Sequence, residues 1–379
     1  MRTLAELPVE GRRVLVRADL NVPLRDGEVA DDSRIRASLP TIRELLDRGA
    51  AQVIVSSHLG RPKGQAVPEL SLRPVAVRLS DLLGEPVDFP EPADHRVALL
   101  ENLRFDPREE RNDPSLASEL AARADAYVND AFGAAHRAHA STTGVAGLLP
   151  AAPGLLMTGE LDAFSALLDA PEHPLVVVIG GAKVTDKIGV IDRFRELADS
   201  ILIGGAMAFT FLAAQGVGVG DSMHEDTDGQ AQARRAMAGG RGEIVLPLDI
   251  VVADRFAADA ETKVVPADAI PEGWMGLDIG PQTAADYAAR LGRARTIFWN
   301  GPMGVFEMAP FAAGTLAVAN AVADSPAVSV VGGGDSLAAV NQAGVADRIS
   351  HVSTGGGAAL ELIEGRTLPG VAALGEGES

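Results

Sequence analysis

Short runs of apolar residues alternate with helical patterns along almost the whole chain, and this alternation is the strongest constraint on its fold. The runs are continuously hydrophobic rather than alternating apolar and polar, which is typical of strands buried on both faces. Helical patterns such as residues 35–48 and 187–198 lie between them. Strands that alternate with helices predict parallel sheets covered by helices. The candidate strands are residues 14–17, 52–56, 97–100 and 126–129, then 175–179, 200–203, 244–246, 296–299 and 328–331.

The length of the chain allows two such domains. It has 379 residues, whereas one domain usually holds about 100–200. Prolines and a glycine interrupt the pattern at residues 150–154, and a helical stretch follows at residues 155–168. We therefore expect an α/β protein with two doubly wound, parallel-sheet domains of the Rossmann type at residues 1–153 and 172–364. A linker helix and hinge over residues 154–171 would join them.

Composition removes several classes of function. The net charge of −19 argues against a nucleic-acid binder, which is usually basic. No apolar run approaches the length of a membrane span, and the N-terminus lacks the pattern of a signal peptide. There are no cysteines, which excludes disulfides, thiolate metal sites and a cysteine nucleophile. We expect a cytoplasmic protein that binds small molecules and neither nucleic acid nor membrane.

Glycines directly follow many of the apolar runs in the second half. In a parallel sheet, ligands bind at the edge where the strands' carboxyl ends lie, and glycine lets backbone amides approach a phosphate closely. A single glycine pair reads most simply as a tight turn, but five such turns in one domain predict a polyphosphate site. The turns contain Gly180–Gly181, Gly204–Gly205, Gly301, Gly332–Gly334 and Gly355–Gly357.

Two of the four lysines of the chain, Lys183 and Lys187, lie four residues apart after one of these turns. We expect them on one face of a helix, where both ammonium groups could reach the same phosphate chain; surface ion pairing is the alternative. Asp335, just after three glycines, is a candidate magnesium ligand or else a helix N-cap. No Gly-Lys dipeptide and no complete G-x-G-x-x-G motif is present, which disfavours a Walker A loop and a nicotinamide-dependent dehydrogenase.

Basic residues recur just after the strands of the first half, and arginine suits carboxylate and phosphate ligands. Surface ion pairing remains the alternative for any one of them. His58, His136 and His139 do not form a recognisable metal motif. The basic candidates for an anion site are Arg17, Arg34, His58, Arg61, Arg104 and Arg137.

Eight motifs in a fixed order resemble those of the phosphoglycerate kinase family and span nearly the whole chain. They are Arg17-x-Asp19-x-Asn21-Val22-Pro23, Ser57-His58-Leu59-Gly60-Arg61-Pro62, Glu101-Asn102-Leu103-Arg104-Phe105, Asp130-Ala131-Phe132-Gly133 with His136-Arg137-Ala138-His139, Gly180-Gly181-Ala182-Lys183-Val184-x-Asp186-Lys187, Trp299-Asn300-Gly301-Pro302-x-Gly304-Val305-Phe306-Glu307, Gly332-Gly333-Gly334-Asp335 and Ser353-Thr354-Gly355-Gly356-Gly357.

The resemblance implies a monomeric glycolytic kinase that transfers a phosphoryl group reversibly between magnesium-bound ATP and the carboxylate of 3-phosphoglycerate. Domain closure would bring ATP and the acceptor together to give ADP and 1,3-bisphosphoglycerate. A non-catalytic nucleotide-binding relative of the same fold is the alternative. The segment at about residues 365–379 would pack back on the N-terminal domain.

The resemblance also assigns residues. The expected catalytic groups are Arg34, Lys187, Gly333 and Gly356, and Asp335 is the expected magnesium ligand. Ser336 stands where threonine is common and Ala206 where many members have glycine. Asp19, Asn21, Arg34, His58, Arg61, Arg104 and Arg137 would bind 3-phosphoglycerate, and Lys183, Lys187, Gly204, Gly205, Gly276, Glu307, Gly332, Gly333, Gly334, Asp335 and Ser336 would bind the nucleotide.

Overall fold

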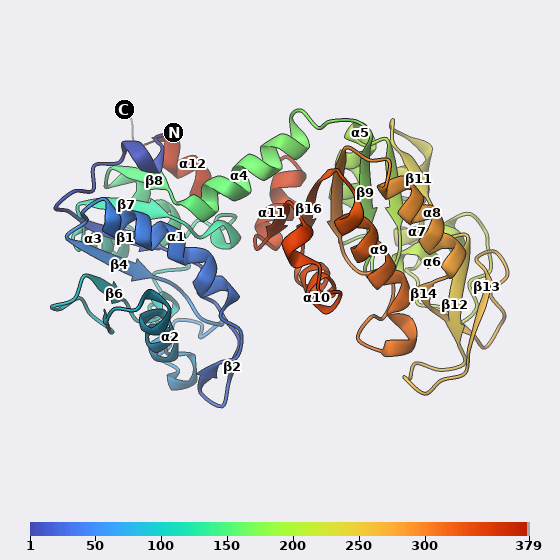
Figure 1. Cartoon of the computed structure of the whole chain (residues 1–379), viewed down its shortest axis with the longest axis horizontal. Coiled ribbons are helices and arrows are strands. Elements are labelled where there is room, and N and C mark those ends of the chain that lie inside the picture. The colour runs from blue at the N-terminus through green and yellow to red at the C-terminus, as the bar shows by residue number, and fades with distance from the viewer. Residues whose placement is uncertain (377–379) are drawn as a thin grey trace. The chain divides into compact units, whose positions relative to one another are not determined.

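The computed structural model describes residues 1–376 and divides into two compact units (Figure 1). The first unit comprises residues 1–162 together with the chain from Arg366 onward, and the second comprises residues 163–365. The helix α4 (Leu155–Leu168) begins in the first unit and ends in the second. Residues 377–379 of the expected C-terminal segment lie outside the described residues. In the described part of the chain, no helix is long and apolar enough to cross a membrane.

The first unit is built on a six-stranded parallel sheet in the order β5-β6-β4-β1-β7-β8. A short hairpin, β2–β3, lies outside this sheet. The strands are β1 (Arg13–Arg17), β4 (Gln52–Ser56), β5 (Val87–Asp88), β6 (Val97–Leu99), β7 (Ala126–Asn129) and β8 (Ala151–Pro153), and the hairpin is β2 (Leu24–Arg25) and β3 (Glu28–Val29).

Helices cover both faces of this sheet because every second strand residue points to the opposite side. Val14 and Val16 share a core with α1 (Ser33–Asp47) and α2 (Arg73–Leu83). Leu15, between them, packs in a second core with α3 (Pro114–Ala121) and α12 (Pro369–Glu376). Strands buried on both faces explain why the apolar runs show no polar alternation.

The C-terminal segment belongs to the first unit. Figure 1 shows α12 beside β8, in agreement with their close backbone contacts. The amide of Gly370 donates to the carbonyl of Ala135 at 2.9 Å, and the side chain of Asn129 donates to the Gly370 carbonyl at 3.3 Å. Residues 366–376 therefore complete the core of a unit whose other residues end about 200 positions earlier in the chain.

The second unit has its own six-stranded parallel sheet, in the order β11-β10-β9-β15-β16-β17. One face packs on α8, α9 and α10, and the other on α5, where Phe194 stacks on Phe298 with ring centres 5.0 Å apart. The strands are β9 (Leu175–Ile179), β10 (Ser200–Ile203), β11 (Glu243–Val245), β15 (Thr296–Asn300), β16 (Val328–Gly332) and β17 (His351–Ser353). The helices are α5 (Ile188–Leu197), α6 (Met207–Ala214), α7 (Thr227–Ala238), α8 (Pro281–Leu291), α9 (Ala313–Asp324), α10 (Gly334–Gln342) and α11 (Gly357–Ile363).

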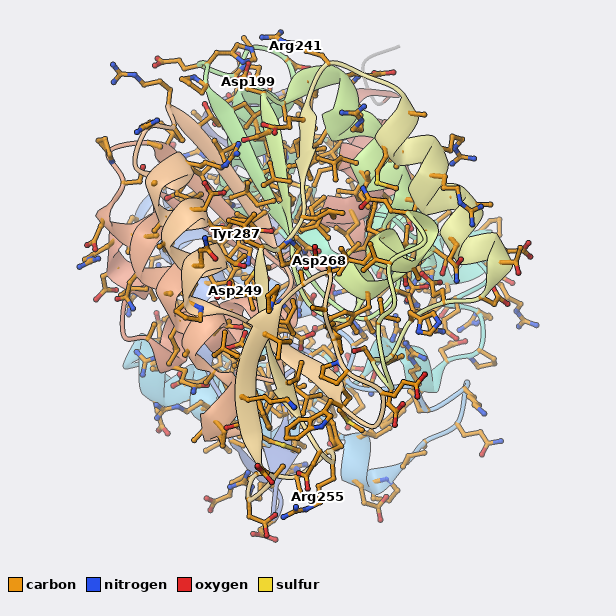
Figure 2. All side chains as sticks on the ribbon, turned by 90° about the vertical axis from the view of Figure 1, so that its right-hand side faces the viewer. Asp199, Arg241, Asp249, Arg255, Asp268 and Tyr287 are labelled. Carbon is orange, nitrogen blue, oxygen red and sulfur yellow. The ribbon has the colours of Figure 1, made fainter. Side chains whose placement is uncertain are left out.

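Figure 2 shows Asp199 and Arg241 together near the top of the view, and Tyr287 and Asp249 together near its middle. Asp199 and Arg241 form an ion pair of 3.1 Å just before β10 and β11, at the amino ends of the strands. Asp249 accepts the amide protons of Gln282 and Thr283 at the start of α8. One turn further along α8, the Tyr287 hydroxyl donates to the carbonyl of Ile203 at 2.7 Å. These bonds fix α8 against the carboxyl end of β10.

The structure corrects two expectations about the fold. Residues 150–154 do not simply break the chain, because Ala151–Pro153 form β8 at the edge of the first sheet, where proline is tolerated. The second unit also contains a three-stranded antiparallel sheet that the apolar pattern did not indicate. Its strands are β12 (Asp249–Ala253), β13 (Thr262–Pro266) and β14 (Met275–Ile279).

Candidate functional site

The carboxyl ends of β9 and β15 mark the point in the second unit where the strand order reverses. From β9 the chain builds β10 and β11 on one side, and from β15 it builds β16 and β17 on the other. Such a switch point is the usual ligand position in an open α/β sheet. Lys187 follows β9, and Asn300 is the last residue of β15.

The ammonium group of Lys187 is held at this switch point by oxygen atoms from both strands. Its Nζ donates to the Gly180 carbonyl at 2.8 Å and to the Asn300 carbonyl at 3.2 Å, and a third bond reaches the Asn300 side-chain oxygen. Burial lowers the pKa of Lys187 to about 8, although the nearby charges of Asp335 and Asp186 act in the opposite direction. The three acceptors are all neutral, so the ammonium charge has no bonded counter-ion among the described residues.

Asn300 was not identified as a site residue from the sequence, although it lies inside one of the recognised motifs. Its side chain is buried, and its Nδ2 donates to the carbonyl of Gly332 at 2.7 Å. The next residue on, Gly333, has a φ of +95°, and a Cβ atom there would come within 2.7 Å of the same Nδ2. Asn300 thus connects Lys187 to the glycine turn after β16. The sequence feature that could have identified Asn300 is its position at the end of an apolar run.

The expectation that Lys183 and Lys187 lie on one face of a helix is wrong. Helix α5 begins only at Ile188, so both lysines lie in the loop before it. The carboxylate of Glu225 holds this loop by accepting the amide protons of Val184, at 2.5 Å, and Thr185, at 3.3 Å. Lys183 is exposed, whereas Lys187 turns back toward the sheet.

A cavity of about 450 Å³ opens beside this loop. Most of its wall is apolar, and it includes Phe209, Ile250 and Val305. Four of the expected nucleotide residues line it, namely Gly205, Gly276, Glu307 and Asp335. Glycine is required at position 276, where a Cβ atom would lie 2.2 Å from the Phe209 ring.

Several nucleotide candidates lie in the turns around this cavity or directly after them. Gly205 has a φ of +67°, and an added Cβ would lie 2.5 Å from backbone atoms of Gly181, so the turns after β10 and β9 are in contact. Gly204 is buried against Met303. Ser336 is wholly buried, and its hydroxyl accepts the amide proton of Gly301 at 2.6 Å.

The glycine turn after β16 opens the helix α10. Gly333 caps the helix, Gly334 is its first residue, and Asp335 lies exposed in its first turn. The carbonyl of Gly332 is occupied by Asn300. Asp335 is therefore not the N-cap that the sequence left open as an alternative.

Basic side chains meet at the carboxyl edge of the first sheet. His58 follows β4 and is almost wholly buried, and its pKa is lowered well below its usual range by burial and by the charges of Arg17, Arg104, Arg34 and His139. The pKa of Arg104 is lowered chiefly by burial, partly opposed by Glu110, while the charge of Arg137 lowers it further. Arginine and histidine side chains from β1, α1 and the segments after β4, β6 and β7 thus lie close enough to perturb one another.

The polar candidates hold this cluster in place. Asp19 forms an ion pair with Arg34, in the first turn of α1. The side chain of Asn21 accepts the amide proton of Gly60 at 2.9 Å, and Arg104 donates to the carbonyl of the same residue at 2.9 Å. The Gly60 turn is therefore fixed from both sides.

The two remaining candidates occupy different settings. The Nε of Arg137 lies 3.1 Å from the Nε2 of His136. Arg61 is exposed in the loop after β4, three residues beyond His58. We define the basic cluster as Arg17, Arg34, His58, Arg104 and Arg137, the groups that perturb one another.

Arg17 is the residue of this cluster whose surroundings the sequence did not reveal. It is wholly buried at the end of β1, and its Nε donates to the hydroxyl of Ser141 at 2.8 Å. That hydroxyl donates to the buried carboxylate of Glu109 at 2.6 Å. Ser141 and Glu109 lie more than 90 residues from Arg17 in the sequence, and no local pattern indicates this pairing.

Comparison with known proteins identifies the family of the chain. The model of the family described as phosphoglycerate kinase matches residues 4–366. The chain is 57% identical over 389 aligned residues to the phosphoglycerate kinase of Rubrobacter xylanophilus, covering 100% of this chain and 99% of the relative. It is 56% identical to that of Frankia alni, covering 99% and 100%.

Solved structures of the same family resemble this fold over the whole chain. Phosphoglycerate kinase from Coxiella burnetii superposes with a TM-score of 0.91 at 41% identity, with 99% of each chain covered. The enzyme from Pyrococcus horikoshii gives a TM-score of 0.85 at 34% identity, covering 100% of this chain and 99% of that one. The chain therefore belongs to the phosphoglycerate kinase family, whose members are phosphotransferases with a carboxyl group as acceptor.

Proposed function

We propose that the protein transfers the terminal phosphoryl group of ATP reversibly to the carboxylate of 3-phosphoglycerate, forming 1,3-bisphosphoglycerate in glycolysis. The observation that carries this proposal is the division of two complementary sites between the two units. The basic cluster suits a small acid with several negative charges, whereas the apolar cavity beside Lys187 suits a nucleotide base next to its phosphates.

In the proposed acceptor site, the basic cluster surrounds the phosphoglycerate, with Asp19 and Asn21 orienting Arg34 and the Gly60 turn. The acceptor carboxylate is ionised at neutral pH, so it attacks without a general base. Arg34, partly exposed, has its guanidinium available to approach the moving phosphoryl group. This arrangement supports a reaction driven by positioning and by charge stabilisation.

In the proposed nucleotide site, the base enters the apolar cavity and the phosphates run along the glycine turns. Lys183 is exposed and free to approach them, and Glu307 lies at the cavity wall for the ribose. Lys187 exchanges its neutral oxygen partners for phosphate oxygens near the transferred group. Backbone amides of the Gly332–Gly334 and Gly355–Gly357 turns would also lie around the phosphates. Gly333 and Gly356 in these turns both have positive φ.

Asp335 fits a magnesium ion that takes most of its ligands from nucleotide phosphates. It is exposed in the first turn of α10 and lines the cavity. Within the described residues, no group of three or more acidic or histidine side chains is placed to bind a metal on its own. One carboxylate together with phosphates and water is the usual setting for magnesium, which would neutralise charge on the phosphate oxygens.

Because the acceptor and nucleotide sites lie on different units, we propose that the units close during each reaction cycle. Closure would also exclude water, which would otherwise hydrolyse the acyl phosphate. The helix α4, which is shared between the units, and the residues that follow it are the proposed hinge. We expect the protein to act as a monomer in the cytoplasm.

The proposal is tested by measuring ATP-dependent turnover of 3-phosphoglycerate with magnesium, coupled to reduction of the product. We expect turnover of roughly 1–100 per second, as is usual for kinases, and its loss when magnesium is chelated. A control with Asp335→Ala should show a weaker response to magnesium at unchanged affinity for phosphoglycerate. A folded protein that binds nucleotide but turns over no phosphoglycerate would contradict the proposal.

A further inference from the structure

The contact between Arg17 and His58 determines the chemical form of the histidine. One terminal nitrogen of the Arg17 guanidinium lies 3.1 Å from the Nδ1 of His58. Every nitrogen of a guanidinium is a donor, and the group stays protonated in proteins. Nδ1 must therefore accept this hydrogen bond, and so it cannot carry a proton. A neutral imidazole with an unprotonated Nδ1 has its single proton on Nε2.

The orientation of Arg17 is fixed by further bonds. Its Nε donates to the Ser141 hydroxyl at 2.8 Å, and a terminal nitrogen donates to the Ala18 carbonyl. The Ser141 hydroxyl and amide donate in turn to the two oxygens of Glu109, at 2.6 and 3.1 Å. All three side chains are at most 1% exposed. Arg17 therefore cannot turn away from His58 without breaking a buried, charge-compensated chain of hydrogen bonds.

The other charges around His58 also disfavour its protonation. Arg34 from α1, Arg104 from the loop after β6 and His139 from the loop after β7 all act with Arg17 and with burial to lower the pKa of His58. The acids in this region are already engaged. Asp19 pairs with Arg34, Glu110 lies 3.3 Å from Arg104, and Glu109 bonds to Ser141.

We infer that Arg17 is a positioning residue that locks His58 as the neutral tautomer protonated on Nε2, so that His58 offers bound phosphoglycerate one N–H donor and no charge. Among the described residues, the hydrogen bond of the His58 ring is the one that its Nδ1 accepts from Arg17. The ligand named here rests on the proposed function, whereas the tautomer rests on the contact itself. An ordinary histidine would instead gain and lose charge near pH 6.5.

The test is nuclear magnetic resonance of the full chain labelled with ¹⁵N-histidine, recorded without ligand. There are seven histidines, and the His58 signals are assigned as those missing in His58→Gln. We expect the shift pattern of an unprotonated Nδ1 and a protonated Nε2, unchanged from about pH 5.5 to 8. A protonated Nδ1, or conversion to imidazolium within that range, would overturn the inference.

Arg17→Met then removes the donor while keeping a long side chain. The His58 signals should become those of a mixture of tautomers, and the KM for phosphoglycerate should rise more than the KM for ATP. Arg13→Met is the matched control, because Arg13 lies at the other end of β1 and its side chain is 48% exposed. It should leave the His58 signals unchanged, and a similar change in both variants would contradict a specific role of Arg17.

Two further measurements keep the inference testable on its own. If Arg17→Met does not fold, Ser141→Ala keeps the arginine but removes the acceptor of its Nε, and it should loosen the tautomer preference in the same direction. Calorimetric titration of the unmodified protein with 3-phosphoglycerate tests the ligand separately. If His58 is the Nε2 tautomer but the protein does not bind 3-phosphoglycerate, the proposed ligand is wrong. If the protein binds 3-phosphoglycerate but Nδ1 of His58 is protonated, the proposed tautomer is wrong.

Discussion

Replacement of Asn300 by alanine tests whether the phosphate-site lysine depends on a neutral side chain at the switch point. Asn300 is 4% exposed and makes two hydrogen bonds through its side chain. One accepts from the ammonium of Lys187, and the other donates to the carbonyl of Gly332 at 2.7 Å. Alanine removes both bonds but leaves the backbone carbonyl of residue 300, which still accepts from Lys187.

The expected loss of stability follows from these two bonds. A hydrogen bond to a charged group contributes roughly 1.5–3 kcal/mol, and a buried carbonyl left without a partner costs roughly 1–3 kcal/mol. We therefore expect the free energy of unfolding of the second unit to fall by roughly 3–4 kcal/mol. The pKa of Lys187, already lowered to about 8 by burial, should fall further, because one acceptor that favours the charged form is lost.

Urea unfolding followed by tryptophan fluorescence measures this change in the relevant unit. The chain has two tryptophans, Trp274 and the wholly buried Trp299, and both belong to the second unit. Asn320→Ala is the matched control. Asn320 is exposed on α9 of the same unit and donates to the carbonyl of Leu316 at 2.8 Å, so its replacement should change stability by no more than about 0.5 kcal/mol.

A loss below about 1 kcal/mol in Asn300→Ala, or one equal to that of Asn320→Ala, would refute the reasoning. Either result would mean that the Lys187 ammonium is adequately held by the two backbone carbonyls alone. A large loss of stability with an unchanged affinity for ATP would instead show that Asn300 supports the sheet edge but not the nucleotide site.

Three other predictions concern the two sites and the start of α4. Arg34→Ala should lower kcat by roughly 10³, and a loss under tenfold would remove Arg34 from the transfer step. Gly276→Ala places a Cβ 2.2 Å from the Phe209 ring, so it should weaken ATP binding in a titration while the KM for phosphoglycerate stays constant. Burial raises the pKa of Asp130 to about 6, so the folded protein favours the protonated carboxyl. Ionisation of Asp130 therefore destabilises the folded state, and the free energy of unfolding should fall by roughly 3 kcal/mol as pH rises from about 4 to above 6. Thermal melts of Asp130→Asn should lack this fall, and an unchanged pH profile would show that Asp130 is not its source.

Much of the framework could be predicted from the sequence because it depends on local hydrophobicity. The strands at residues 52–56, 126–129, 175–179 and 200–203, and the helix at residues 155–168, have the expected boundaries. The antiparallel sheet could not be predicted in this way. Its edge strand β13 is mostly exposed and has no apolar run, and its pairing with β12 depends on contacts beyond any local window.

By itself the sequence determined that two parallel α/β units carry basic and glycine-rich loops at their strand ends, and its ordered motifs determined the family. These features follow from residue type and short-range spacing, which a chain carries before it folds. Tertiary structure decided how the side chains are paired. Lys187 meets Asn300 only because β9 and β15 are neighbours in the sheet, and Arg17 meets His58 only because β1 lies beside β4. The acceptors and donors that set the charge and tautomer of these groups come from strands far apart in the sequence.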